Sequence, residues 1–244
     1  SREDPTMPDD KAVNGRRDFL RKTLTVIPAV TLAGYGVGHA MQTPAAEQDK
    51  PRERYQPRFF TNTEWAFVNA AVARLIPSDD NGPGAIEAGV PEFIDRQMET
   101  PYGHGALWYM QGPFVTDAAP EFGHQLKLVP RDIYRVGIAA LERWSKANQG
   151  KPFADLEPSA QDDILQRLEA GQIDLQDLPA KLLFGQLLQN TREGFFSDPQ
   201  HGGNRGLVGW KLVGFPGARA DFMDWADRGE KYPFPPVAIS GERG

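Results

Sequence analysis

Residues 59–77, "FFTNTEWAFVNAAVARLIP", carry the clearest folding signal in this chain of 244 residues. Thr61 and Glu64 are spaced as a capping box, in which each side chain bonds the backbone amide of the other residue at the start of a helix. Pro77 ends the same helix, because proline lacks the amide hydrogen that a helix interior needs. The apolar residues between these signals recur at helical spacing and predict one buried face: Trp65, Val68, Val72, Leu75 and Ile76.

Similar signals predict helices along much of the remaining chain. Proline suits the first turn of a helix, and glycine is favoured just after the last one. The predicted segments are 90–98, 130–150, 158–170, a helix capped by Asp177 and Pro179 that buries Leu182, Leu183 and Leu187, and a final helix that starts at Pro216 and buries Phe222 and Trp225. No strand pair or internal repeat is evident, so the predicted fold class is mainly α, a single helical domain over residues 59–228.

Three segments are rich in glycine and proline and predict long loops. Residues 100–129, which begin "TPYGHGALWYMQGPF", predict a packed loop with a short helix at most. Residues 194–217 hold seven glycines among phenylalanine, tryptophan and proline. That density indicates many turns with positive φ, held against something close. Residues 229–244 predict an extended or polyproline-like tail.

The N-terminal part predicts an export signal and a linker. In "NGRRDFLRKT", residues 14–23, the pattern formed by Arg16, Arg17, Phe19 and Leu20 resembles the twin-arginine (Tat) signal. The apolar run after it is short and broken by Pro28 and several glycines, so it falls short of the roughly 20 apolar residues that a stable membrane anchor needs. Residues 1–40 therefore predict a signal peptide, with a basic amphipathic or anchoring helix as the alternative. Residues 41–58, polar and proline-rich, predict an extended linker.

Composition excludes several kinds of site. The chain has no cysteine, which rules out disulfides, iron–sulfur clusters, thiolate zinc sites and covalent c-type haem. Its formal charge is −6, whereas nucleic-acid binding relies on clustered lysine and arginine. No Gly-x-Ser-x-Gly elbow, dinucleotide fingerprint or paired histidine motif is present. We therefore expect no catalytic, cofactor or metal site in this chain and no nucleic-acid partner.

The remaining signal is aromatic. Tryptophan and phenylalanine in the glycine-rich segment and the tail suit a protein–protein interface as well as a core, because aromatic anchors dominate such surfaces. The candidate partner interface consists of Phe195, Phe196, His201, Asn204, Arg205, Trp210, Phe215, Tyr232 and Phe234.

Two long stretches resemble the gluconate 2-dehydrogenase subunit 3 family. They are "FFTNTEWAFVNAAVARLIPSDDNGPGAIEAGVPEFIDRQM", residues 59–98, and "GFFSDPQHGGNRGLVGWKLVGFPGA", residues 194–218. The resemblance implies the small subunit of a membrane-bound dehydrogenase. Its partners would be a large FAD-containing subunit that oxidises a sugar or sugar acid and a multihaem cytochrome c subunit that passes electrons to ubiquinone. The family brings no catalytic residues to this chain.

Together, signal and resemblance predict a non-catalytic subunit that stabilises the flavoprotein and supplies its export signal to the Tat translocase. The complex would face the periplasm and associate with the inner membrane. The oxidised substrate could equally be fructose, sorbitol, glucose or 2-ketogluconate. Two alternatives of another class stay open: an independent periplasmic hydrolase or lyase that uses Asp198 and His201, and a solitary binding module.

Overall fold

The computed structural model describes residues 55–115, 117–225 and 227–244. The chain divides into two compact units, Ser1–Arg52 and Glu53–Gly244, and the described residues all belong to the second. The expected export signal and nearly all of the expected linker lie outside the described residues. The second unit is mainly helical, as predicted, and its described residues form no β-strand. No helix among them is long and apolar enough to cross a bilayer.

The first described helix, α2 (Asn62–Leu75), begins with the predicted capping box. The amide of Glu64 donates to Thr61 Oγ1 over 3.4 Å, and the amide of Thr61 donates to Glu64 Oε2 over 2.8 Å. Its buried face is centred on Phe67, Val68, Ala71 and Val72. This face is rotated by part of a turn from the predicted one. Trp65, Leu75 and Ile76 pack only partly buried at the edge of the core.

The next four α-helices begin close to their predicted starts, and the first three of them also end close to their predicted ends. They are α3 (Val90–Met98), α4 (Pro130–Gln149), α5 (Pro158–Ala170) and α6 (Ala180–Phe196). Gly150 adopts a left-handed conformation that ends α4, as expected of a C-terminal glycine. At the start of α6, Pro179 supplies no side-chain cap, and Asp177 instead forms an ion pair with Arg143 on α4.

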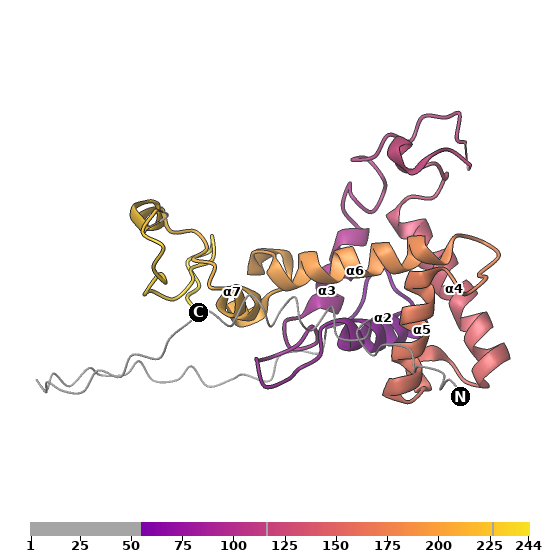
Figure 1. Cartoon of the computed structure of the whole chain (residues 1–244), viewed down its shortest axis with the longest axis horizontal. Coiled ribbons are helices and arrows are strands. Elements are labelled where there is room, and N and C mark those ends of the chain that lie inside the picture. The colour runs from indigo at the N-terminus through magenta and orange to yellow at the C-terminus, as the bar shows by residue number, and fades with distance from the viewer. Residues whose placement is uncertain (1–54, 116, 226) are drawn as a thin grey trace, which may run out of the picture. The chain divides into compact units, whose positions relative to one another are not determined.

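Helix α6 is central to the packing, because it contacts α3, α4 and α5, as well as α2 (Figure 1). Gly137 of α4 lies directly beneath Leu183 of α6, where an added Cβ would approach Leu183 Cδ1 to 2.7 Å. The two helices therefore pack closely here, and a larger residue at position 137 would require the side chain of Leu183 to move. The core between the helices is apolar and closed to solvent, with Phe67, Tyr134, Phe153, Ile164, Leu168 and Leu183 among its largest fully buried side chains.

The prediction of a helix from Pro216 is wrong. The α-helix in this region, α7 (Val208–Val213), lies before that proline, and a 3₁₀ helix, η5 (Ala220–Trp225), follows it. Gly214 and Gly217 both have positive φ, which interrupts any helix through Pro216. Phe222 and Trp225 are half-buried and pack edge-on against the ring of Tyr232.

Two segments predicted as extended make specific backbone or side-chain bonds, the first with helix α3 and the second with the glycine-rich segment and within itself. At the end of the predicted linker, Tyr55 and Arg58 donate hydrogen bonds to Asp95 of α3. In the predicted tail, Val237 pairs with Gly217, and the chain then turns so that the amide of Ala238 bonds the carbonyl of Glu242. In the described part of the loop between α3 and α4, the helical structure is a short 3₁₀ helix, η1 (Pro120–Phe122), as expected, and the loop projects from the helices in Figure 1.

Candidate partner-binding site

The glycine-rich segment after α6 packs against the C-terminal end of that same helix. A Cβ on Gly203 would overlap the carbonyl of Gly194, and a Cβ on Gly209 would overlap the carbonyl of Phe195. Neither site has room for any side chain. The glycines are therefore held against something close, as the sequence indicates, and that neighbour is this chain's own helix.

Asn204 organises this segment from the inside. It is fully buried and adopts a left-handed conformation, with φ of 45°. Its Nδ2 donates to the carbonyl of Ser197 over 2.9 Å, and its Oδ1 accepts from the amide of Gly209 over 2.8 Å. Nearby, Trp210 Nε1 donates to the carbonyl of Phe196 over 2.7 Å. Side chains thus satisfy carbonyls at the end of α6 that the helix itself leaves without partners.

A buried carboxylate ties the segment to α3. Glu92, in the first turn of α3, is buried and forms ion pairs with Arg96 and Arg205. The amide of Arg205 also donates to the carbonyl of Ala88 over 3.1 Å. Gly89 has a φ of 75°, and a Cβ there would approach Arg205 Nε to 2.7 Å. A buried carboxylate requires such pairing, because unpaired charge in the interior is strongly unfavourable.

A second buried carboxylate of α3 holds the chain that precedes α2. Asp95 is fully buried and accepts hydrogen bonds from the amides of Arg58, Phe59 and Phe60 and from Tyr55 Oη. Burial, followed by the hydrogen bond and charge of Asp95, raises the pKa of Tyr55 to about 12. Asp95 thereby fixes the position at which the N-terminal segment joins the helical domain.

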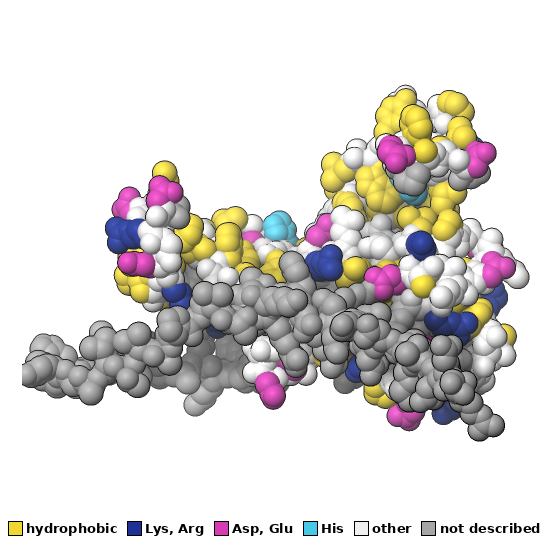
Figure 2. Space-filling view, in the orientation of Figure 1, with side chains coloured by type: hydrophobic (Ala, Val, Ile, Leu, Met, Phe, Trp, Pro, Cys, Tyr) yellow, Lys and Arg dark blue, Asp and Glu magenta, His cyan; other side chains and the backbone are white. Residues whose placement is uncertain are grey.

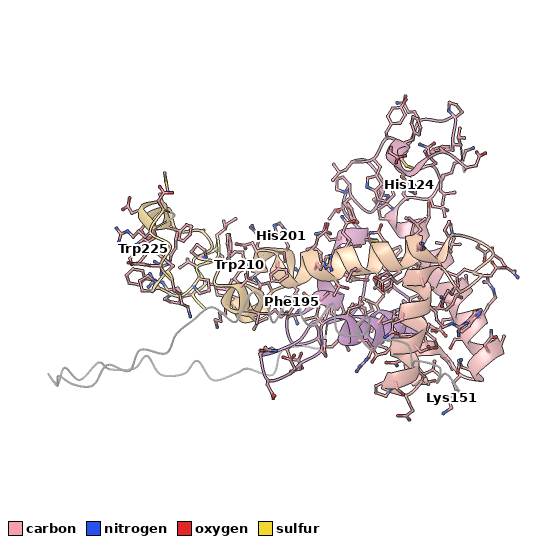
Figure 3. All side chains as sticks on the ribbon, viewed as in Figure 1. His124, Lys151, Phe195, His201, Trp210 and Trp225 are labelled. Atoms are coloured by element: carbon pink, nitrogen blue, oxygen red, sulfur yellow. The ribbon has the colours of Figure 1, made fainter. Side chains whose placement is uncertain are left out.

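The structure separates the nine candidate interface residues into three groups. Figure 3 shows Phe195, His201 and Trp210 gathered around the C-terminal end of α6. The first group is buried. Within it, Phe195 and Asn204 lie in the interior and offer no surface to a partner, which corrects their selection, and Trp210 and Tyr232 are almost fully buried. Arg205 is engaged with Glu92. The exposed candidates are Phe196, His201, Phe215 and Phe234.

The exposed candidates have apolar neighbours that the sequence pattern does not single out. Val213, Met223 and Ile239 are exposed near them in the chain. We call the six exposed apolar residues of this region, Phe196, Val213, Phe215, Met223, Phe234 and Ile239, the C-terminal surface. Their signal in the sequence is weak, because isolated apolar residues between glycines and prolines suit a buried position equally well.

The two residues named for an independent hydrolase or lyase differ in environment, since Asp198 is bonded to the backbone and His201 is exposed. Asp198 Oδ1 accepts from the amide of Gln200 over 3.1 Å, and Oδ2 accepts from the amide of Ile239 over 2.8 Å. Oδ1 therefore stabilises a local turn, and Oδ2 joins this segment to the C-terminal tail. His201 is exposed at the edge of an open hollow of 420 Å³ that Phe93, Gln97 and Glu193 also line. Over the described ranges, no group of three or more histidine and carboxylate side chains is placed to hold a metal ion.

One further carboxylate has an unusual environment in the core. Glu142 of α4 is buried, and its Oε1 accepts from the amide of Phe153 over 3.3 Å. Its Oε2 is buried without a hydrogen-bond partner. Burial raises the pKa of Glu142, although the bond from Phe153 and the charge of Lys146 oppose this effect. This carboxylate lies between α4 and the 3₁₀ helix η2 (Phe153–Asp155) and does not line the hollow beside His201.

Comparison with known protein families gives one match, which covers most of the helical domain. A family model described as gluconate 2-dehydrogenase subunit 3 matches residues 62–217. The matched region begins at α2 and ends at Gly217, so it includes both buried carboxylates of α3 and the whole glycine-rich segment. No curated protein and no solved structure matches the chain.

Proposed function

The chain belongs to the gluconate 2-dehydrogenase subunit 3 family, and from this premise we propose how it works as a subunit of a dehydrogenase complex. In this proposal the chain is non-catalytic. It stabilises an FAD-containing large subunit, supplies that subunit's Tat signal, and joins it to a multihaem cytochrome c subunit at the periplasmic side of the inner membrane. The observation that carries the proposal is the family match over residues 62–217.

The described residues support a binding role. Their polar clusters serve the fold, since Glu92 and Asp95 anchor neighbouring segments and Asp198 bonds the amide of Ile239 in the tail. Meanwhile, the C-terminal surface leaves six apolar side chains in solvent. Exposed apolar side chains that are gathered in one region are typical of a surface that a partner covers.

The export part of the proposal follows from where FAD is available. A flavoprotein that acquires FAD in the cytoplasm must cross the membrane folded, which is what the Tat pathway allows. If the large subunit has no signal of its own, a tightly bound partner must supply one. The arginine pair Arg16 and Arg17 is the feature of this chain that fits that need.

Two experiments test the proposal. Purification of the tagged chain from its native membrane should recover a yellow, haem-containing complex that reduces a quinone analogue, whereas a colourless single protein would contradict the proposal. Replacing Arg16 and Arg17 with lysine should leave both this chain and the large subunit in the cytoplasm. If the large subunit still reaches the periplasm, it does not depend on this signal.

The same purified sample identifies the substrate and distinguishes the proposal from the remaining alternatives. Related complexes would oxidise fructose, sorbitol, glucose or 2-ketogluconate, and assays of the purified complex with each compound and with gluconate identify the substrate. An independent hydrolase or lyase would be active without partners. A solitary binding module would purify as a stable monomer with no coloured partner.

A further inference from the structure

The loop between α3 and α4 exposes large apolar side chains. Leu107, Tyr109 and Phe122 are 73%, 79% and 72% exposed, and Val115 is 47% exposed. We call these four residues the loop surface. Figure 2 shows hydrophobic side chains gathered on the projecting loop, above α6 in that view. They lie outside the candidate interface that the sequence predicts.

The loop is braced by its own contacts. The rings of Trp108 and His124 pack with their centres 4.6 Å apart, and His124 Nε2 bonds the carbonyl of Leu128 over 2.8 Å. Gln125 Oε1 accepts from the amide of Val115 over 3.2 Å. The apolar side chains are therefore held in solvent by a formed structure, which lowers the entropy lost when a partner binds.

The area of the loop surface indicates how it is used. If a large side chain exposes about 200 Å² when fully accessible, the loop surface offers roughly 500 Å² of apolar area. The C-terminal surface offers a similar amount, since its six members are more covered. A stable interface buries about 800 Å² on each partner, and permanent complexes bury more. A little over half of such an interface is apolar, so the apolar area of the loop surface matches what one stable interface contains.

The few charged residues of the loop indicate what kind of partner it fits. Between Arg96 and Lys127 the chain has no lysine or arginine, and from residue 100 to 126 its charged side chains are Asp117 and Glu121. Attraction to anionic lipid headgroups requires clustered basic residues near the surface. The loop surface therefore fits a protein whose contact site is apolar and bordered by basic groups.

The loop also offers a concave feature. An open hollow of 610 Å³ lies beside Met110, Gly112, Pro113, Phe114 and Lys127. Protein interfaces concentrate their binding energy where a side chain of one partner enters a pocket of the other. The loop therefore has a hollow that can receive a partner's side chain and exposed side chains that can enter a pocket of the partner.

We propose that the loop surface is a docking site for the large dehydrogenase subunit. This inference rests on the proposed function, because it assigns a place on this chain to the partner that function requires. It adds a site that aromatic content in the glycine-rich segment does not predict.

Co-purification of variants from the native membrane tests the inference. The combined variant Leu107→Ser, Tyr109→Ser and Phe122→Ser should recover at least tenfold less large subunit than the unsubstituted chain. The matched control is Ile86→Ser, since Ile86 is also an exposed large apolar residue but lies outside both surfaces. It should recover the normal amount.

A second experiment does not require the protein to fold with three substitutions. A photocrosslinking amino acid at position 109 should link the chain to the large subunit, and the same group at position 86 should not. Normal recovery with the combined variant, or no crosslink from position 109, overturns the inference. Flotation of the purified chain with phosphatidylethanolamine–phosphatidylglycerol vesicles, lost in the combined variant, would also overturn it by assigning the loop to a membrane surface. If the unsubstituted chain recovers no large subunit, the proposed function itself fails.

Discussion

Arg205 in the glycine-rich segment forms an ion pair with Glu92, a buried carboxylate in the first turn of α3. The pair joins two stretches that are far apart in the sequence, both inside the matched family region. Arg96 pairs with the same carboxylate from one turn further along α3. This arrangement places the glycine-rich segment on the helical domain before any partner is bound.

Replacing Arg205 with alanine should destabilise the domain by about 1–3 kcal/mol, because it removes one of two cations from a buried carboxylate. The remaining pair with Arg96 keeps the loss below that of a fully unpaired charge. Denaturant unfolding of the purified domain measures the change. Arg192→Ala, which removes an exposed arginine from α6, is the control and should have little effect. Equal effects of the two substitutions would contradict a specific role for Arg205.

Replacing Gly209 with alanine should destabilise the domain strongly, because the new Cβ would overlap the carbonyl of Phe195. The matched control is Gly185→Ala in the interior of α6, where an added Cβ meets nothing within 4 Å. There, alanine should stabilise the helix by about 0.5–1 kcal/mol, since glycine is the poorer helix former. Thermal melting of both variants gives shifts of opposite sign. A neutral Gly209→Ala variant would show that the segment is not tightly packed on α6.

The helices were predictable from sequence because their signals are local. The capping box at Thr61, the proline at Pro130 and the glycine at Gly150 each act within one or two turns of the helix that they begin or end. The burial of Phe195 and Asn204 was not predictable in this way. It results from contact between the glycine-rich segment and the end of α6, and aromatic residues among glycines look the same in sequence whether they are covered or exposed.

The two carboxylates of α3 were missed for a related reason. Glu92 and Asp95 flank Phe93 and Ile94 on a short helix and lie three residues apart, a pattern typical of one buried and one solvated face. Both acids are nevertheless buried, because the segment around Phe59 and the side chain of Arg205 cover them. These partners come from distant parts of the chain, so no local pattern identifies them.

Glu142 should make stability depend on pH. Burial raises the pKa of this carboxyl in the folded state, so the folded protein holds the proton more tightly than the unfolded chain does. The protonated carboxyl therefore contributes fully to the free energy of unfolding below the ordinary pKa of a glutamate, and this contribution is lost as the pH rises through the raised pKa. The neutral variant Glu142→Gln should match the unsubstituted protein in acid and exceed it in stability at neutral pH.

Urea unfolding of both proteins across that range of pH measures the difference. Glu230→Gln, which neutralises an exposed glutamate, is the control and should show no such divergence. A constant difference between Glu142→Gln and the unsubstituted protein at every pH would mean that Glu142 does not titrate between the two states.

Replacing Asp95 with asparagine should release the chain that precedes α2. The carboxylate accepts four hydrogen bonds, three from amides of residues 58–60 and one from Tyr55 Oη, and an asparagine amide can accept only through its single oxygen. We expect a loss of about 3 kcal/mol or more in stability, because hydrogen bonds to a buried charge are among the stronger ones.

Tyr55 supplies a spectroscopic readout of the same change. Its pKa, about 12 in the unsubstituted protein, should fall toward the ordinary value of tyrosine in Asp95→Asn, because release of the segment removes the burial and the Asp95 hydrogen bond that raise it. Ultraviolet titration of the tyrosines, with Tyr55→Phe to identify the signal, measures this pKa. An unchanged Tyr55 titration in Asp95→Asn would show that Asp95 does not hold this segment in solution.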